Sequence, residues 1–138
     1  MAVRAVRGAT RVDVDDRETI LAATRELVTE VLVNNDLKPA DVVSVVFTAT
    51  RDLTAVAPAL AARQLGLHEA ALICAQEMWV EGSMPRVVRL LAHVETERPR
   101  EAVVNVYLRG TEVLRGDVPP VPPSSDGSAQ PEESPREP

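Results

Sequence analysis

Two arginines that fall within predicted strands are the side chains of this sequence best placed to do chemistry. Arg7 lies among small apolar residues on one face of an N-terminal strand, and Arg89 lies between Val87 and Leu91 on one face of a later strand. Burying an isolated guanidinium is costly, so each group needs a partner. The partner can be a carboxylate such as that of Glu77, water at an exposed edge, or an anionic ligand, which an arginine grips through paired hydrogen bonds. The pattern alone favours a solvated or ion-paired face and leaves the ligand as an alternative.

Groups for other kinds of catalysis are scarce in the sequence. The glycines are isolated, so no phosphate-binding loop is predicted. Cys74 is the only cysteine, which leaves no pair for a disulfide within the chain and no thiolate cluster; a small side chain buried in a strand is its simplest interpretation. His68 and His93 do not have the spacing of metal ligands. We therefore expect no metal and no cofactor.

Composition excludes several classes of partner. The 138 residues suit one domain. The formal net charge is −6, and most of it lies in residues 117–138, so the rest of the chain is close to neutral and gives no electrostatic footprint for nucleic acid. No apolar run approaches the roughly 20 residues that span a bilayer, and the N-terminus lacks the apolar stretch of a signal peptide. We expect a cytoplasmic protein that binds neither nucleic acid nor membrane.

A change in composition near Gly116 divides the chain. Residues 1–116 carry the alternating apolar pattern of a folded domain, whereas residues 117–138 are rich in Pro, Ser and Glu. Such a segment has too little apolar surface to offset the entropy that it would lose on ordering. We predict one domain over residues 1–116 and a disordered tail over residues 117–138.

The elements that must position the two arginines follow from the spacing of apolar residues. Asp15 or Asp16 caps the first helix, with Glu18 forming a capping box with Asp15, and the helix ends near Asn34. Residues 42–50 are nearly all apolar and β-branched, which predicts a central strand covered on both faces. The remaining predicted elements are a helix over residues 55–65 and strands over residues 2–12, 70–78, 87–95, 103–108 and 111–115, the last two joined by a turn at Gly110.

This order predicts an α/β (α+β) fold with helices on one face of a mixed β-sheet. In residues 87–95 a clean apolar face, which we expect to be buried, consists of Val88, Leu90, Ala92 and Val94. The opposite face of the sheet, which carries Arg89, would be partly apolar and uncovered, and such a face is an aggregation risk. A closed trimer that packs these faces around a threefold axis removes the risk.

Short motifs spread over most of the chain resemble those of the AroH-type chorismate mutases. Residues 4–10 read R-A-V-R-G-A-T, similar to the R-x-I/V-R-G-A-T start of that family. Further matches follow in order at the family's separations, at residues 38–43, 48–59, 61–65, 74–78, 89, 106–108 and 113–115. The resemblance covers about residues 3–118 and leaves out the tail.

The resemblance implies a fold, an activity and an assembly. Members of that family are homotrimers with a pseudo-α/β barrel core, and their active sites lie in clefts between adjacent subunits. They rearrange chorismate to prephenate without a cofactor, in the synthesis of phenylalanine and tyrosine. The reaction is unimolecular: it needs the substrate held in a compact conformer, and a fixed positive donor where negative charge grows on the ether oxygen. The short inventory of catalytic groups fits this chemistry.

The matching positions imply a set of site residues. Arg89 would hydrogen-bond the ether oxygen and help to hold the side-chain carboxylate, which Arg7 and Tyr107 would also grip. Glu77 would bind the ring hydroxyl, with Cys74 nearby. The implied catalytic residues are Arg89, Arg7 and Glu77. The other implied substrate-binding residues are Arg63 and Arg115 near the mouth, the apolar walls Ala57, Ala59, Ile73 and Leu114, and also Ala75 and Gln76.

Two features of the sequence depart from the family's pattern. Ala57 stands where an aromatic residue is common and Leu60 where lysine is common, so the contacts at the mouth of the cleft differ. Cys74 and Glu77 are three residues apart and would face opposite ways in a regular strand. Either the strand bends there, or Cys74 contributes through its backbone, or the two residues serve different clefts.

Two other functions are compatible with part of the pattern. A non-catalytic trimeric module could use the same arginines to bind a small carboxylate, but it would not need a donor at the ether oxygen. A different trimeric enzyme, resembling the reactive-imine deaminases, could share the architecture. However, the R-G-A-T opening and the Cys-x-Gln-Glu segment resemble only the mutases. We therefore predict a chorismate mutase.

Overall fold

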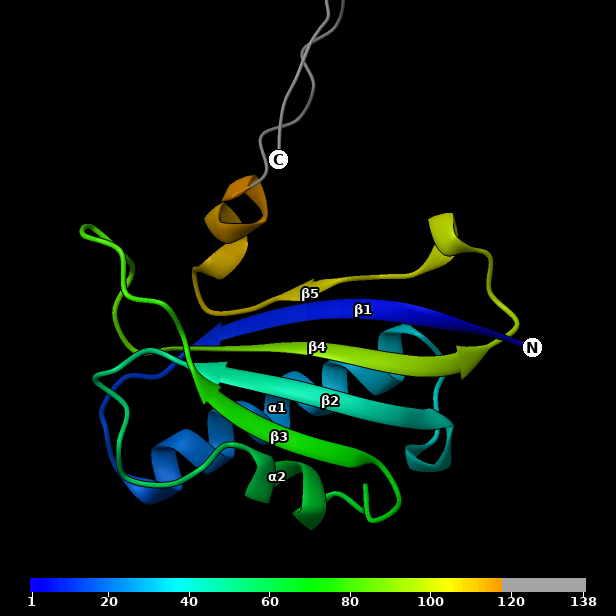
Figure 1. Cartoon of the computed structure of the whole chain (residues 1–138), viewed down its shortest axis with the longest axis horizontal. Helices are drawn as coiled ribbons and strands as arrows, with labels where there is room; N and C mark the ends of the chain where they lie inside the picture. Colours follow the sequence, from blue (N-terminus) through cyan, green and yellow to red (C-terminus); the bar gives the residue numbers. More distant parts are fainter. Residues whose placement is uncertain (118–138) are drawn as a thin grey trace, which may run out of the picture.

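The computed structural model describes residues 1–117, which form a five-stranded sheet with two α-helices behind it (Figure 1). The strands are β1 (Ala2–Arg11), β2 (Val42–Ala49), β3 (Ala71–Gln76), β4 (Val87–Thr96) and β5 (Val106–Tyr107). The helices are α1 (Arg17–Asn34) and α2 (Ala59–Gln64), with short 3₁₀ helices η1 (Pro39–Asp41), η2 (Arg100–Ala102) and η3 (Thr111–Asp117). The disordered tail is predicted over residues 117–138, and residues 118–138 of it lie outside the described residues.

The sheet is mixed, as predicted. Its strand order is β3-β2-β4-β1-β5. The central strand β4 runs antiparallel to both β2 and β1, whereas the outer pairs β2–β3 and β1–β5 are parallel. Both α-helices pack on the same face of the sheet (Figure 1). Within residues 1–117 no helix has the length and apolar composition that crossing a membrane requires.

The core lies between the helices and one face of the sheet. The apolar face predicted for β4 is buried there, and Phe47 of β2 is fully buried beside it. The other large contributors are aliphatic, and burying each of their CH₂ groups contributes about 0.8 kcal/mol. From α1 they are Ile20, Leu21, Leu27, Val28 and Val31.

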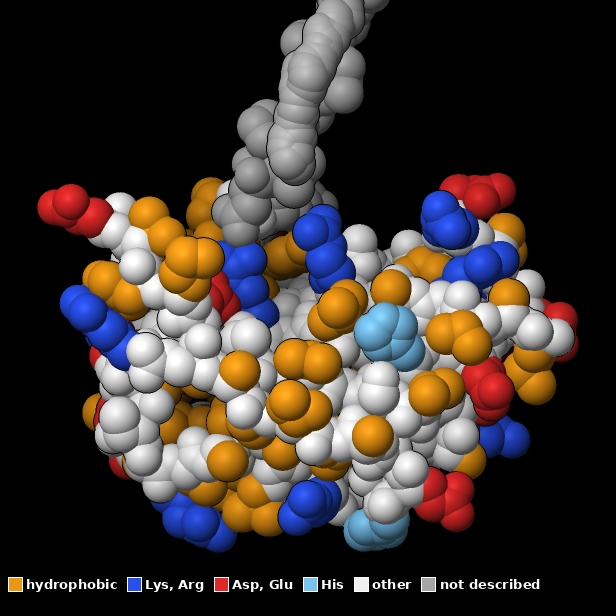
Figure 2. Space-filling model, in the orientation of Figure 1, with side chains coloured by type: hydrophobic (Ala, Val, Ile, Leu, Met, Phe, Trp, Pro, Cys, Tyr) orange, Lys and Arg blue, Asp and Glu red, His pale blue; other side chains and the backbone are white. Residues whose placement is uncertain are grey.

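The other face of the sheet is uncovered within one chain, and we call it the open face. On this face Leu91 of β4 pairs with Arg7 of β1 on one side and with Val46 of β2 on the other, and Val46 pairs with Ile73 of β3. Ile73 is 56% exposed and Leu91 is 37% exposed. Figure 2 shows hydrophobic side chains spread across this face. The strand predicted over residues 42–50 is β2, which lies inside the sheet between β3 and β4, but the expectation that both of its faces are covered is wrong for a single chain.

The first helix begins at a predicted aspartate cap, but the capping box is wrong. Oδ1 of the N-cap Asp16 accepts a hydrogen bond from the Thr19 N–H (2.8 Å). Asp15 instead accepts bonds from the N–H and the hydroxyl of Thr54 (3.0 Å each) and from the N–H of Ala55 (3.1 Å). The bond from the Thr54 N–H is the main reason that the pKa of Asp15 lies below its usual value. Asp15 thus ties the start of α1 to the loop after β2, which no local helix pattern could indicate.

Two predicted elements differ from the structure. The helix expected over residues 55–65 starts only at Ala59, because Pro58 disfavours a helical conformation for the residue before it. The strand expected over residues 111–115 is the 3₁₀ helix η3, and the strand expected over residues 103–108 is shortened to β5. The buried hydroxyl of Thr111 contacts the carbonyl oxygens of Leu108 (2.7 Å) and Ala9 (3.1 Å). These contacts anchor the segment to the end of β1 in place of a hairpin.

Gly8 allows α1 to pack closely on β1. A Cβ at this position would lie 3.1 Å from Cδ1 of Leu27 and 3.3 Å from the carbonyl oxygen of Val106. We expect Gly8→Ala to destabilise the fold by about 1–3 kcal/mol, because extra volume in a packed core forces neighbours to shift. Urea unfolding followed by circular dichroism measures the change. An unchanged unfolding midpoint would show that the contact relaxes without cost.

Candidate active site

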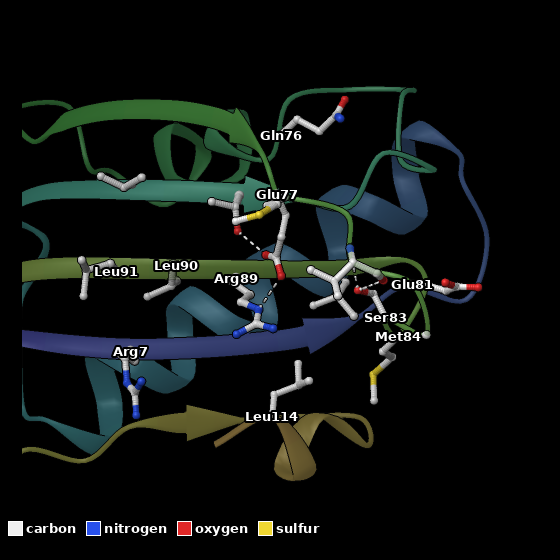
Figure 3. A pocket seen from close by; sticks show the side chains of 16 residues that line it. Arg7, Gln76, Glu77, Glu81, Ser83, Met84, Arg89, Leu90, Leu91 and Leu114 are labelled. Carbon is white, nitrogen blue, oxygen red and sulfur yellow. Dashed lines mark hydrogen bonds and ion pairs between the residues drawn. The ribbon is translucent and has the colours of Figure 1, made fainter. Parts of the chain in front are cut away.

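A cleft of about 860 Å³ lies on the open face, where β3 ends and β4 begins (Figure 3). Its floor is the sheet, one wall is the loop of residues 77–86 between β3 and β4, and another is η3. We call it the cleft. Its lining residues are Arg7, Val46, Thr48, Gln76, Glu77, Met78, Val80, Glu81, Gly82, Ser83, Met84, Val87, Arg89, Leu90, Leu91 and Leu114.

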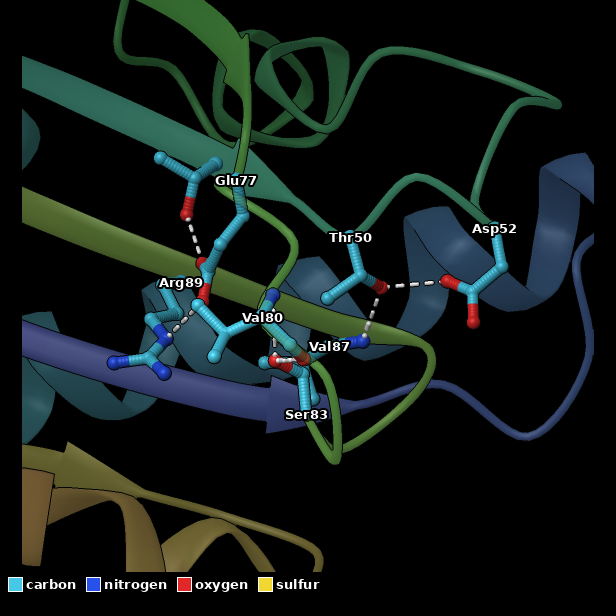
Figure 4. Close-up of polar contacts among 8 residues, drawn as sticks. Thr50, Asp52, Glu77, Val80, Ser83, Val87 and Arg89 are labelled. Atoms are coloured by element: carbon cyan, nitrogen blue, oxygen red, sulfur yellow. Dashed lines mark hydrogen bonds and ion pairs between the residues drawn. The ribbon is translucent and has the colours of Figure 1, made fainter.

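A chain of three polar side chains crosses the floor of the cleft. Nε of Arg89 lies 2.9 Å from Oε2 of Glu77, and Oγ1 of Thr48 donates a hydrogen bond of 2.7 Å to Oε1 of the same carboxylate (Figures 3 and 4). The side chains of Arg89 and Glu77 are only 32% and 21% exposed. Charges in such a partly desolvated place interact more strongly than they do at the surface. The pair is therefore held more rigidly than an exposed ion pair would be.

The local sequence explains how Glu77 reaches Arg89. Arg89 faces the cleft because side chains alternate along β4, and its pairing partner on β2 is Thr48. Glu77 follows the last residue of β3, and its N–H donates to the carbonyl of Ala49 (2.9 Å). The backbone therefore leaves the regular strand just before Glu77, so its side chain can reach across β2 to β4.

Cys74 does not join Glu77 in this cleft. It pairs with Phe47, a core residue, which puts it on the helix side of β3. It is exposed there because β3 is an edge strand. Within one chain, Cys74 and Glu77 thus belong to different faces of the sheet.

Arg7 brings a second guanidinium to the cleft. It is exposed on β1, and its backbone N–H donates to Oδ1 of Asn105 (2.8 Å), which links β1 to the segment before β5. Figure 3 shows Arg7 and Arg89 on neighbouring strands, with Leu114 of η3 on the opposite wall. The cleft thus combines two cationic groups with an apolar wall, which suits a small organic anion.

A set of contacts fixes the loop of residues 77–86 at both ends. The guanidinium of Arg51 lies 4.4 Å from the ring centre of Trp79. At the other end, Asp52 accepts the N–H of Arg86 (3.1 Å) and the hydroxyl of Thr50 (2.6 Å), as Figure 4 shows for Thr50. Arg86 has a positive φ of 54°, which is unusual for a side-chain-bearing residue. Asp52 therefore sets the point at which β4 starts, two residues before Arg89.

The structure divides the implied site residues into two groups. The first group lines the cleft and consists of Arg7, Gln76, Glu77, Arg89 and Leu114. Tyr107 is half-buried on β5 beside it and pairs with Ala9. The second group is absent from the cleft lining, lies on the edge strand β3 and at α2, and consists of Ala57, Ala59, Arg63, Ile73, Cys74 and Ala75. The backbone of Arg115 belongs to η3, and its side chain lies outside the description.

Sequence reasoning missed Thr48 and the loop of residues 78–84, both of which contribute to the cleft. Thr48 could be identified only from the register between β2 and β4, because its own strand reads as a plain apolar segment. The loop has no regular spacing, and its place over the sheet depends on Asp52 and Arg51, which are distant in sequence. Among residues 1–117, no three His, Cys, Asp or Glu side chains gather in the way that a metal site requires.

The sequence and the fold both match known proteins. Residues 3–118 match the family model described as chorismate mutase type I. The chain is 45% identical over 117 residues to the chorismate mutase AroH of Thermus thermophilus, covering 84% of this chain and 96% of that protein. It is 40% identical over 119 residues to the chorismate mutase AroH of Bacillus subtilis, covering 86% of this chain and 94% of that protein.

A solved structure gives the same result for the fold. The chain superposes on the chorismate mutase from Clostridium thermocellum with a TM-score of 0.77 and 39% sequence identity. The match covers 79% of this chain and 97% of that protein. Most of the described residues therefore have an equivalent position in that structure.

Proposed function

This chain belongs to the chorismate mutase type I family and has the activity of a chorismate mutase, an isomerase of aromatic amino-acid biosynthesis; we propose that the cleft containing Arg89 is where it rearranges chorismate to prephenate. The observation that supports this assignment is the ion pair of 2.9 Å that holds Arg89 against Glu77. In the reaction an ether C–O bond breaks while a C–C bond forms within one molecule. No atom is gained or lost, because the migrating group stays within the same molecule.

Arg89 supplies the positive charge that the reaction requires. As the C–O bond lengthens, negative charge grows on the ether oxygen, and a donor fixed beforehand stabilises it without reorganising. Figure 3 shows the terminal nitrogens of Arg89 directed away from Glu77, while Nε faces Glu77. Glu77 thus holds the donor at Nε, and in the proposed mechanism the guanidinium donates to the ether oxygen of the substrate.

The other groups hold the dianion in its compact conformer. Arg7 and Tyr107 bind the side-chain carboxylate together with Arg89, and Glu77 also accepts a hydrogen bond from the ring hydroxyl. Leu114 packs against the carbon skeleton. Bringing the two reacting ends together in this way removes much of the entropic part of the barrier.

The active unit is a homotrimer in which each site lies between two subunits. The exposed apolar residues of the open face, such as Ile73 at 56% exposure, support this because a second copy would cover them. The second group of implied residues, which includes Arg63 and Cys74, lies on the edge strand β3 and at α2, outside the cleft lining. In a ring of subunits that edge of one copy completes the cleft of its neighbour, with Cys74 and Glu77 coming from different subunits.

A direct assay tests the site and its activity together. Purified protein should consume chorismate, followed by the loss of its ultraviolet absorbance, and should form prephenate. A protein that binds small dicarboxylates but turns over no chorismate would instead be a carboxylate-binding trimer, and the catalytic assignment of the cleft would be wrong. The location in the cytoplasm stays a prediction that cell fractionation can check.

A further inference from the structure

We propose that Thr48 is a positioning residue for the rearrangement: its hydroxyl fixes the carboxylate of Glu77, and this carboxylate in turn fixes the guanidinium of Arg89. The inference rests on the proposed function, in which Arg89 donates to the ether oxygen. It requires no contact between Thr48 and the substrate.

The two oxygens of Glu77 have different partners. Oε1 accepts the hydrogen bond from Thr48 (2.7 Å), and Oε2 lies 2.9 Å from Nε of Arg89. The terminal torsion of a glutamate is broad and has little intrinsic preference. One contact would therefore leave the carboxylate plane free to rotate, whereas two contacts on opposite oxygens define it. Thr48 provides the contact that does not involve Arg89.

The sheet puts Thr48 in register with the group that it acts on. Thr48 and Arg89 are directly paired across β2 and β4, and Glu77 approaches from the end of β3. The neighbouring open-face residues of β2 have different surroundings. Val46 is apolar, and the hydroxyl of Ser44 lies 3.2 Å from Nδ1 of His93. The hydroxyl at position 48 is thus matched to Glu77 by its place on the strand.

This arrangement indicates that loss of the Thr48 hydroxyl would slow the chemical step more than it would weaken substrate binding. Arginine has a long side chain with many rotamers, and a donor that must reorient during each turnover stabilises the transition state less well. Binding of the substrate carboxylates involves other cationic groups as well, above all Arg7. Loosening Glu77 should therefore lower kcat more than it raises KM.

The test compares Thr48→Val with Thr48→Ser in the chorismate assay. Valine keeps the shape of threonine and removes the hydroxyl, so we expect kcat to fall about tenfold, as for loss of a hydrogen bond to a charged group, with KM changed less than about twofold. Serine should restore most of kcat, and both variants should unfold near the wild-type temperature. An unchanged kcat in Thr48→Val, or a serine variant as slow as the valine variant, would overturn the proposal. Thr48→Ala replaces the valine variant if that protein does not fold.

Two further variants separate this proposal from the function on which it rests. In a Glu77→Ala background, Thr48→Val should cost nothing more, and a full additional loss would show that Thr48 acts through another group. Ser44→Ala, on the same strand and face, should keep wild-type kcat. If Arg89→Ala is inactive while Thr48→Val is fully active, only the role of Thr48 is wrong. If Arg89→Ala is fully active, the proposed site itself is wrong.

Discussion

Arg89→Ala should lower kcat for the rearrangement of chorismate by about 10²–10³-fold or more, the cost of removing one preorganised donor from a site that stabilises developing negative charge. The reason lies in the geometry of the cleft, where Arg89 is only 32% exposed and Glu77 holds its Nε at 2.9 Å. Water that fills the vacated space would have to orient during the reaction, which an arginine fixed beforehand does not. The measurement is the initial rate of chorismate loss at saturating substrate.

Two companion variants show whether the effect is specific. Arg89→Lys keeps a positive charge but loses the planar fork, so it cannot engage Glu77 and the substrate with separate edges, and we expect most of the activity to be lost. Arg109→Ala is the matched control, because Arg109 makes an ion pair of the same length (2.9 Å) with Glu26 on the surface and should affect neither kcat nor KM. A folded Arg89→Ala protein with near wild-type kcat would remove Arg89 from the mechanism.

The fold was predictable where a residue pattern has one structural solution. The alternation of β4 identified its buried face correctly, and α1 begins after a predicted aspartate cap and ends at Asn34, as expected. The prediction failed where distant contacts decide the outcome. Thr111 is fixed by the end of β1, and Asp15 by the loop at Thr54. No local rule contains either partner, so a strand and a capping box were expected in their places.

The site was predictable from resemblance far more than from physical pattern. Periodicity alone placed Arg7 and Arg89 on sheet faces but favoured solvation or ion pairing, and Arg89 is in fact paired with Glu77. The ion pair and the catalytic role do not exclude each other, because a guanidinium has five N–H donors and the contact with Glu77 is made by Nε. The position of Thr48 depends on strand register, which a single sequence does not encode in any local signal.

Mixing two defective variants should restore activity if each site is shared between subunits. Arg89→Ala damages the group of residues in the cleft, and in the proposed site Arg63→Glu would damage the group on β3 and α2 by opposing the second carboxylate of the substrate. In randomly mixed trimers from equal amounts, about a quarter of the sites would have both positions intact. Subunit exchange should therefore raise the rate at low substrate to about a quarter of the wild-type rate, far above either variant alone.

The same experiment with a different pair provides the control. Arg89 and Glu77 contact each other within one chain, so their alanine variants damage the same half of every site. A mixed trimer of these two variants contains no undamaged cleft half from either subunit, and its rate should stay at the average of the two. Rescue by the Arg63 variant but not by the Glu77 variant would require a site built from two subunits. If neither pair of variants regains activity on mixing, each chain carries a complete site. The exposed apolar residues of the open face would then need an explanation other than a shared active site.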